Sequence, residues 1–154
     1  MLVLTDSVEI GAPVATWEYV AQSPSEIVLL DRSLLLFRPG GDCAVKVVGA
    51  ADGADQGCFI RIGRGPGELI SPRYAGEPAA DSSFYVYDNN MRLLYHYRWT
   101  QDDAGVPVCS RAGEQYYGGE KYPVFSMVRL ANGYAVAHTC GEDSVLVLLH
   151  PGLQ

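Results

Sequence analysis

A glycine-rich segment at residues 61–72, RIGRGPGELISP, has the composition most suggestive of chemistry in this chain. A phosphate-binding loop requires a lysine for the phosphates, a hydroxyl for magnesium and a helix directly after the loop. Here Pro66 removes a backbone donor, Glu68 stands where a cation is needed, and no helical pattern follows. We therefore interpret the segment as a sharp connection between strands, in which the glycines adopt unusual φ values and Glu68 accepts hydrogen bonds from backbone amides. The alternative is that the loop contacts a ligand through Gly63, Gly65, Pro66, Gly67 and Glu68.

Acidic residues and histidines are the next candidates for chemistry. The loop DGADQG at residues 52–57 lacks the alternating acids and the closing glutamate of a calcium-binding hand, so we interpret it as a solvated loop. Neighbouring carboxylates can act as acid–base pairs or metal ligands, but beside glycine they are more typical of exposed turns. No local spacing unites the histidines into a metal site. The residues concerned are the doublets Asp102-Asp103 and Glu142-Asp143, and the histidines His96, His138 and His150.

The four cysteines are widely spaced, and none forms a C-x-x-C pair that would anchor zinc. We expect buried free thiols, with one disulfide as the alternative in an oxidising compartment. No G-x-S-x-G motif is present for a hydrolase serine, and a cysteine–histidine nucleophile pair has no local signature. The sequence thus predicts no catalytic residue, cofactor or metal site. The cysteines are Cys43, Cys58, Cys109 and Cys140.

Composition excludes several classes of partner. Hydrophobic residues make up 48% of the 154 residues, which is typical of a globular chain, and the net charge is -7 with a pI of about 4.8. Lys and Arg are scattered singly, so neither nucleic acid nor an anionic membrane surface is an expected partner. No apolar run is long enough to span a membrane, and the first residues do not read as a signal peptide.

The elements that position these residues are expected to follow a recurring pattern of strand, tight turn and strand. Strands are expected in 26–37, 44–50, 58–63 and 144–150, and Gly40 and Gly41 suit a hairpin turn. Two further hairpins are expected at 84–99, turning at Asn89-Asn90, and at 125–138, turning at Asn132-Gly133. In the first of these, Tyr95, Tyr97 and Trp99 share one face, and Leu94, His96 and Arg98 share the other. Residues 13–22 suit either one short helix or a strand.

Several expected strands are apolar on both faces, at 27–30, 34–37 and 145–149. Such runs predict a sheet covered on both sides, as in the blades of a β-propeller. Asp31, Asp88 and Asp143 recur at nearly equal spacing beside apolar strands, which favours an internal repeat. We therefore predict an all-β, propeller-like single domain over residues 1–154, with about three four-stranded antiparallel blades forming a half-propeller. A small β-sandwich is the alternative.

The glycine-rich loop also carries a family resemblance. IGRGPGEL at residues 62–69, followed by FYVYDNNMRLLYHY at residues 84–97, resembles the TolB-like six-bladed β-propeller proteins of Bacteroides-type bacteria. That family has a G-x-G-P-G-E-[FY] signature, which residues 63–68 match, whereas Leu69 replaces the usual aromatic residue. The resemblance implies a location in the periplasm or cell envelope. Family members are longer than this chain, so it also implies a half-propeller that pairs with itself or a chain whose C-terminal half is missing.

Aromatic residues give the remaining functional hint. QYYGGEKYPVF, at residues 115–125, places tyrosines around a Gly-Gly turn, and tyrosine is enriched in contact surfaces. We expect a non-enzymatic binding module whose ligand is a protein, peptide or glycan, closed into a ring by a homodimer. The alternatives are a hydrolase or lyase with carboxylates at a central channel, and a purely structural envelope scaffold. The candidate aromatic contact surface is Tyr116, Tyr117 and Tyr122.

Overall fold

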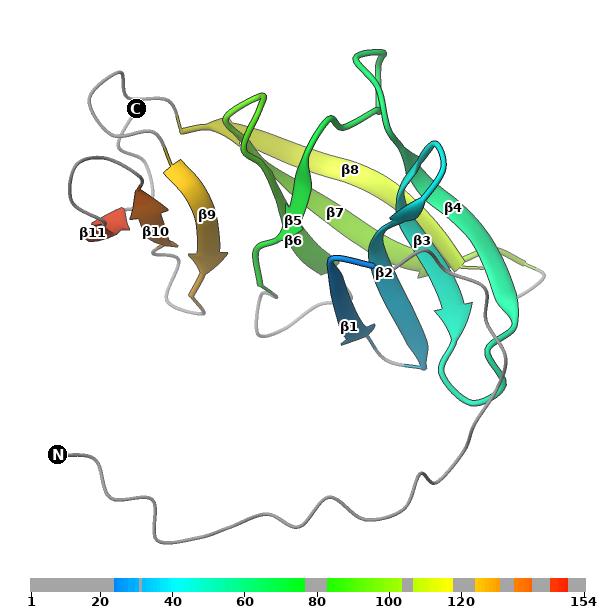
Figure 1. Ribbon diagram of the computed structural model, residues 1–154. Helices are drawn as coiled ribbons and strands as arrows, with labels where there is room; N and C mark the ends of the chain where they lie inside the picture. The colour runs from blue at the N-terminus through cyan, green and yellow to red at the C-terminus, as the bar shows by residue number, and fades with distance from the viewer. Residues whose placement is uncertain are drawn as a thin grey trace, which may run out of the picture.

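The protein is an all-β chain. The computed structural model describes residues 24–30, 32–76, 83–103, 107–117, 124–130, 135–139 and 145–149, which form eleven strands and no helix (Figure 1). Every strand pairing is antiparallel, and the strands form three sheets of consecutive strands. The prediction of an all-β fold with four-stranded antiparallel sheets is confirmed. The expected helix or strand at 13–22 and the turn at Asn132-Gly133 lie outside the described residues.

The first sheet has four strands in chain order, β1 (Glu26–Leu30), β2 (Ser33–Gly40), β3 (Cys43–Gly49) and β4 (Asp55–Arg61). The β2–β3 hairpin turns at two glycines, because Gly40 has a φ of 113° and Gly41 a φ of 65°, which only glycine adopts readily. β4 begins inside the loop expected at 52–57. Asp55 pairs there with Val48 and forms a 2.7 Å ion pair with Lys46, which the sequence pattern does not reveal.

The middle sheet also has four strands, β5 (Pro72–Tyr74), β6 (Ser83–Asp88), β7 (Leu93–Gln101) and β8 (Pro107–Tyr116). The β6–β7 hairpin agrees with the prediction, although Arg92, with a φ of 56°, takes the left-handed conformation expected of an asparagine. The strands β5 and β8 were not expected from the sequence. β5 has only three residues, and most of β8 is exposed or half-buried, so neither strand carries an apolar run.

The third sheet has three described strands, β9 (Val124–Arg129), β10 (Ala135–Thr139) and β11 (Val145–Leu149). β9 and β10 form the expected third hairpin, and Val128 pairs with Val136. β11 pairs with the other side of β10, so that Leu146 stands opposite His138.

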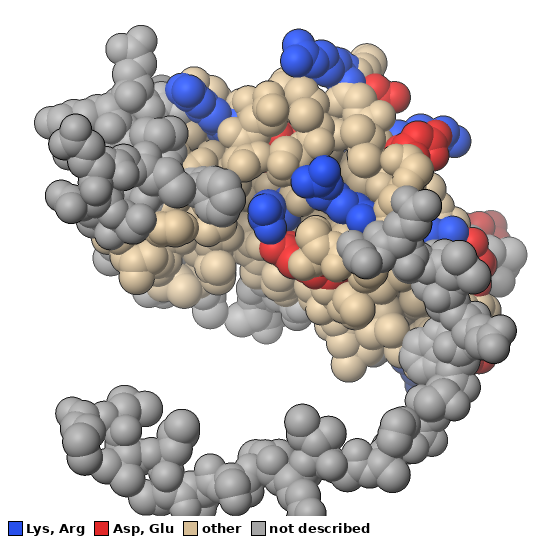
Figure 2. All heavy atoms as spheres, viewed as in Figure 1, with Lys and Arg blue, Asp and Glu red and all other residues tan. Residues whose placement is uncertain are grey.

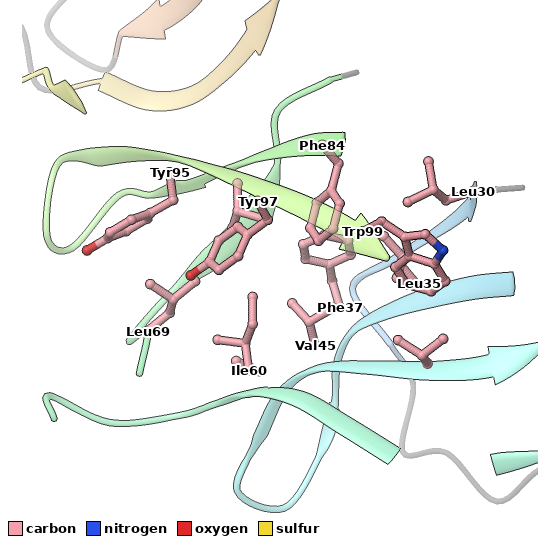
Figure 3. Packing of buried hydrophobic residues seen from close by; sticks show 13 residues of the cluster. Leu30, Leu35, Phe37, Val45, Ile60, Leu69, Phe84, Tyr95, Tyr97 and Trp99 are labelled. Atoms are coloured by element: carbon pink, nitrogen blue, oxygen red, sulfur yellow. The ribbon is translucent and has the colours of Figure 1, made fainter. Parts of the chain in front are cut away.

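The three sheets are stacked, with the middle sheet covered on both faces (Figure 1). One face carries large side chains that point toward β2, β3 and β4 of the first sheet, as Figure 3 shows for Phe84, Tyr97 and Trp99 against Phe37 and Ile60. The opposite face contacts the third sheet through a second cluster: Ala75, Tyr87, Leu94, Tyr117, Met127 and Ala137. The predicted alternation on β7 is therefore confirmed, because Tyr95, Tyr97 and Trp99 are all buried in the first cluster.

The two outer sheets are exposed on one face at their edge strands. Ile27 and Leu29 on β1 are each 61% exposed, and Leu146 on β11 is 73% exposed. The expectation that 27–30 and 145–149 are covered on both sides is therefore wrong at these residues. It holds for the apolar residues at the centre of β2, where Leu35 and Leu36 point to opposite faces and both are buried. The reason is that β1 and β11 are edge strands of the end sheets, whereas β2 lies between β1 and β3.

The first strands of successive sheets lie next to one another. β1 is joined to β5 because the Tyr74 N–H donates to Glu26 Oε2 at 2.7 Å. β5 is joined to β9 because the Arg129 N–H donates to the Ala75 carbonyl at 2.6 Å. Gly76, with a φ of 97°, allows this approach, since a Cβ there would lie 2.7 Å from the Arg129 carbonyl oxygen. The sheets are thus held together along their first strands.

Candidate functional site

The glycine-rich loop connects β4 to β5 and closes on itself through its own backbone. The Leu69 N–H donates to the Arg61 carbonyl and the Gly63 N–H to the Leu69 carbonyl, both at 3.0 Å. Leu69 is fully buried in the core between the first two sheets, which anchors the end of the loop. The Gly65 N–H donates to Glu68 Oε2 at 2.8 Å. These amides are therefore already occupied and do not form a cradle for an anion.

The glycines of this loop serve different purposes. Gly67 has a φ of 85°, whereas Gly63 and Gly65 do not have a positive φ. A Cβ at Gly63 would collide with the Glu68 carboxylate, and one at Gly65 would lie 3.0 Å from Glu68 Oε2. The expectation of unusual φ values holds for Gly67 only, because the other two glycines make room for the carboxylate that folds back over them.

Asp88, at the end of β6, organises this end of the middle sheet. Its side chain is fully buried, and Oδ2 accepts hydrogen bonds from the N–H groups of Ile70 at 2.6 Å and Ser71 at 3.2 Å. Oδ1 accepts from the N–H groups of Asn90 at 2.9 Å and Met91 at 3.1 Å. The carboxylate thus joins the loop before β5 to the β6–β7 turn, and both of its oxygens are used within the fold.

The tyrosines of the predicted contact surface differ in exposure. Tyr116, at the end of β8 opposite Leu93, is 57% exposed, whereas Tyr117 is buried between the middle and third sheets. Burial raises the pKa of Tyr117, and the nearby Arg129 guanidinium opposes this shift. Tyr122 lies outside the described residues. Among the described members of this group, only Tyr116 presents its ring to solvent.

The loop and Tyr116 lie at the same end of the middle sheet (Figure 1). Asp88 holds the loop against the β6–β7 turn, and the Tyr117 N–H donates to the Arg92 carbonyl of the same turn at 2.8 Å. Figure 2 shows basic and acidic side chains interspersed over the described surface in this view, without a basic stripe. We define the loop-end surface by its exposed residues, Arg64, Gly65, Pro66, Gly67, Met91 and Tyr116.

The described histidines and acidic residues are not gathered into a reactive cluster. His96 on β7 stacks on Tyr85 at 4.8 Å between ring centroids and hydrogen bonds Ser83 at 2.9 Å, while His138 lies on β10 of another sheet. Asp52 accepts a hydrogen bond from the N–H of Ala54 within the loop before β4. In the described ranges no group of three or more His, Cys, Asp or Glu side chains could hold a metal ion. His150, Glu142 and Asp143 lie outside those ranges.

The cysteines depart from the sequence prediction. Cys43 on β3 and Cys58 on β4 form a disulfide, so the expectation of free thiols is wrong for these two residues. The register of the two paired strands shifts between Cys43 and Lys46, and the Cα atoms of Cys43 and Cys58 lie 5.8 Å apart, which their spacing in sequence does not reveal. Cys109 on β8 is a free thiol, and burial raises its pKa to about 12, which makes it a poor nucleophile. Cys140 lies outside the described residues.

Two further side-chain contacts were not expected from the sequence. Glu26 joins the first sheet to the middle sheet through the Tyr74 amide, and it also lies 3.7 Å from the Arg73 guanidinium. In the sequence, the indication of this contact was that Glu26 is a single acidic residue at the start of an apolar strand. Arg111 lies over the ring of Tyr95 at 4.5 Å, a contact that depends on pairing with the unanticipated strand β8.

Comparison of the chain with family models, curated proteins and solved structures finds no match. Within the described residues, no helix is long and apolar enough to cross a membrane. The sheet topology and the two core clusters make the chain an all-β protein of three stacked antiparallel sheets.

Proposed function

We propose that this chain is a non-enzymatic binding module, built as three consecutive blades of a β-propeller and working in the bacterial cell envelope. The observation that carries the architecture is the middle sheet, which is covered on one face by the first sheet and on the other by the third. A β-sandwich accounts for two packed sheets, and the first and middle sheets taken alone fit that description. The third sheet, stacked in the same sense with its first strand beside β5, favours blades around a common axis.

The contacts of the acidic residues favour binding over catalysis. A propeller enzyme with carboxylates at its channel needs them free to exchange protons or bind metal. Asp88 instead accepts four backbone hydrogen bonds, and Glu68 accepts one from the loop it belongs to. Both carboxylates are therefore engaged in hydrogen bonds that stabilise the fold, and a catalytic role would require breaking them.

The disulfide supports a location outside the cytosol. Disulfides form and persist in oxidising compartments, which include the bacterial periplasm, and are rare in the cytosol. The bond between Cys43 and Cys58 is consistent with such a compartment. The similarity of residues 62–69 and 84–97 to envelope propellers points in the same direction.

The loop-end surface is our candidate for ligand contact. Loops at one end of a rigid β scaffold commonly carry binding functions. Tyr116 offers a large exposed ring held by an ordered strand, and Met91, at 40% exposed, adds apolar area on the neighbouring turn. A planar aromatic ring at such a surface suits a peptide side chain or the apolar face of a sugar.

An array of glycans and peptides, probed with the purified chain, tests this function. We expect selective binding that falls at least tenfold in the Tyr116→Ala variant, because the exposed ring supplies the contact. Val108→Ala, at a position 42% exposed near the start of the same strand, is the matched control and should keep full binding. Equal binding by wild type and Tyr116→Ala would reject the loop-end surface, and turnover of any arrayed compound would favour a propeller enzyme.

A further inference from the structure

The two ends of the stack present apolar side chains to solvent. On the first sheet, Ile27 and Leu29 of β1 are each 61% exposed and stand opposite Leu36 and Leu34 in the pairing with β2. We call the surface around Ile27 and Leu29 the first end face. Leu36 shares this face but is 4% exposed, so the exposed apolar area lies on the edge strand β1. Neighbouring exposed apolar side chains of this kind mark an interaction site or a liability to aggregate.

The third sheet has an equivalent surface. Val128 on β9 is 51% exposed and Leu146 on β11 is 73% exposed. Val128 pairs with Val136, and Leu146 pairs with His138, so these side chains share the face directed away from the middle sheet. The opposite face, with Met127 and Ala137, is buried against the middle sheet. We call the surface around Val128 and Leu146 the third end face.

The two end faces are complementary by their place in the repeat. The middle sheet receives the first sheet on one face and offers its other face to the third sheet. Among the described residues, no sheet precedes the first end face and none follows the third end face. The third sheet of one molecule can therefore occupy the position before the first sheet of another molecule, with the two end faces in contact.

Charge does not oppose this contact. The chain carries a net charge of -7, which makes association of identical copies unfavourable wherever like charges meet. Val128, Val136 and Leu146 of the third end face are apolar, and on the first sheet Lys46 forms an ion pair with Asp55 at 2.7 Å. Burial of the exposed apolar side chains on each face favours association.

We propose that a second copy of this chain covers both end faces, with the first end face of each copy packed on the third end face of the other. This inference deepens the proposed function, since it rests on the propeller arrangement, and it names the partner. Different surfaces meet at each contact, and a two-fold axis relates the two contacts, so the assembly closes after two copies into a ring of six sheets. Along the inner side, β9 of one copy would lie beside β1 of the other, as β9 lies beside β5 within one copy.

Light scattering on the purified chain gives the first test. We expect twice the chain mass of 16.7 kDa. A mass that stays at that of one chain at every concentration would overturn the proposal, as would open-ended polymers or insoluble aggregate. The monomer outcome would indicate that the end faces are covered by another partner or by further sequence of a longer protein.

Two charged variants test which surfaces meet. Leu29→Glu and Leu146→Lys each place a charge at a largely exposed position, so the fold should persist, and circular dichroism checks that it does. Each variant alone should be monomeric, because both contacts of the ring would contain one altered face. An equimolar mixture should recover the dimer, since one contact is then between unaltered faces and the other pairs glutamate with lysine.

Other patterns would contradict the head-to-tail contact. If the first end face met itself, Leu146→Lys would remain dimeric and the mixture would not recover dimers of Leu29→Glu. If the third end face met itself, the reverse would be seen. Val108→Lys, on an outer strand of the middle sheet, is the control and should keep the wild-type mass. Ligand capture on the array is measured separately, so a monomer that binds a ligand would overturn only the ring.

Discussion

At the scale of single residues, Asp88 is the acidic side chain on which the fold depends most clearly. It accepts four backbone hydrogen bonds while fully buried. In Asp88→Asn an amide NH₂ would replace one oxygen and face two backbone donors. We expect the free energy of unfolding to fall by about 3 kcal/mol, measured by chemical denaturation. Asp103→Asn, at an exposed position, should change it by less than about 0.5 kcal/mol, and equal effects of the two substitutions would contradict the assigned role.

Two buried tyrosines make a matched pair at the same scale. The Tyr87 hydroxyl donates to the Val124 carbonyl at 3.2 Å. The Tyr97 hydroxyl is buried beside Arg111, and no hydrogen bond of normal geometry satisfies it. Tyr87→Phe should therefore cost about 1 kcal/mol at neutral pH, whereas Tyr97→Phe should be neutral or slightly stabilising. Thermal unfolding of both variants compares them, and a larger loss in Tyr97→Phe would show that its hydroxyl has a stabilising partner.

The same tyrosines predict a loss of stability at high pH. Burial raises the pKa of Tyr87 and of Tyr97 to about 12 from an ordinary value of 10.0. Between these values the unfolded chain releases protons that the folded chain retains, so stability is complete below pH 10 and falls as the pH rises toward 12. Cys109 acts in the same direction, starting near pH 9, because burial raises its pKa to about 12 as well. Removing the Tyr97 hydroxyl by Tyr97→Phe should reduce the slope by about 1.4 kcal/mol per pH unit, measured by denaturation at a series of pH values, and an unchanged slope would contradict burial of this group.

At the scale of elements, the β3–β4 hairpin is held by its disulfide as well as by strand pairing. The bond joins Cys43 and Cys58 across a sequence separation of 15 residues. A cross-link of this loop length stabilises the folded chain by about 3 kcal/mol, chiefly by restricting the unfolded chain. Adding reductant should therefore lower the midpoint of denaturation. The double variant Cys43→Ser/Cys58→Ser should start from that lower midpoint and respond no further to reductant, whereas a continued response would locate the redox effect elsewhere.

At the scale of the whole molecule, the junction at Gly76 holds the third sheet against the middle sheet. Gly76→Ala would place a Cβ in a backbone of positive φ and against the Arg129 carbonyl. We expect faster amide hydrogen exchange in β9 and β10 and unchanged exchange in β2 and β3. Gly113→Ala on β8 is the control, because a Cβ there meets nothing within 4 Å. Uniform exchange across all three sheets in Gly76→Ala would show that the junction does not hold the third sheet.

The amino-acid sequence determined the local elements where apolar runs and turn residues agree. The hairpins that include β6 with β7 and β9 with β10 follow from strand patterns at 84–99 and 125–138, and Gly40 and Gly41 mark the β2–β3 turn. The common face of Tyr95, Tyr97 and Trp99 follows from alternation alone, because successive side chains of a strand point to opposite faces. Their burial comes from packing against the first sheet. The accepting role of Glu68 toward a loop amide follows from the crowding of glycines around it.

Tertiary structure decided what depends on residues far apart in sequence. Strand pairing set the disulfide between Cys43 and Cys58, and burial turned Asp88 into the acceptor of four amides. Edge positions in the two end sheets left Ile27 and Leu146 exposed, although their strands are as apolar as the internal strand β2. A run of apolar residues reports which side chains gain from burial, whereas the neighbouring sheet that provides it is fixed only when the whole chain is assembled.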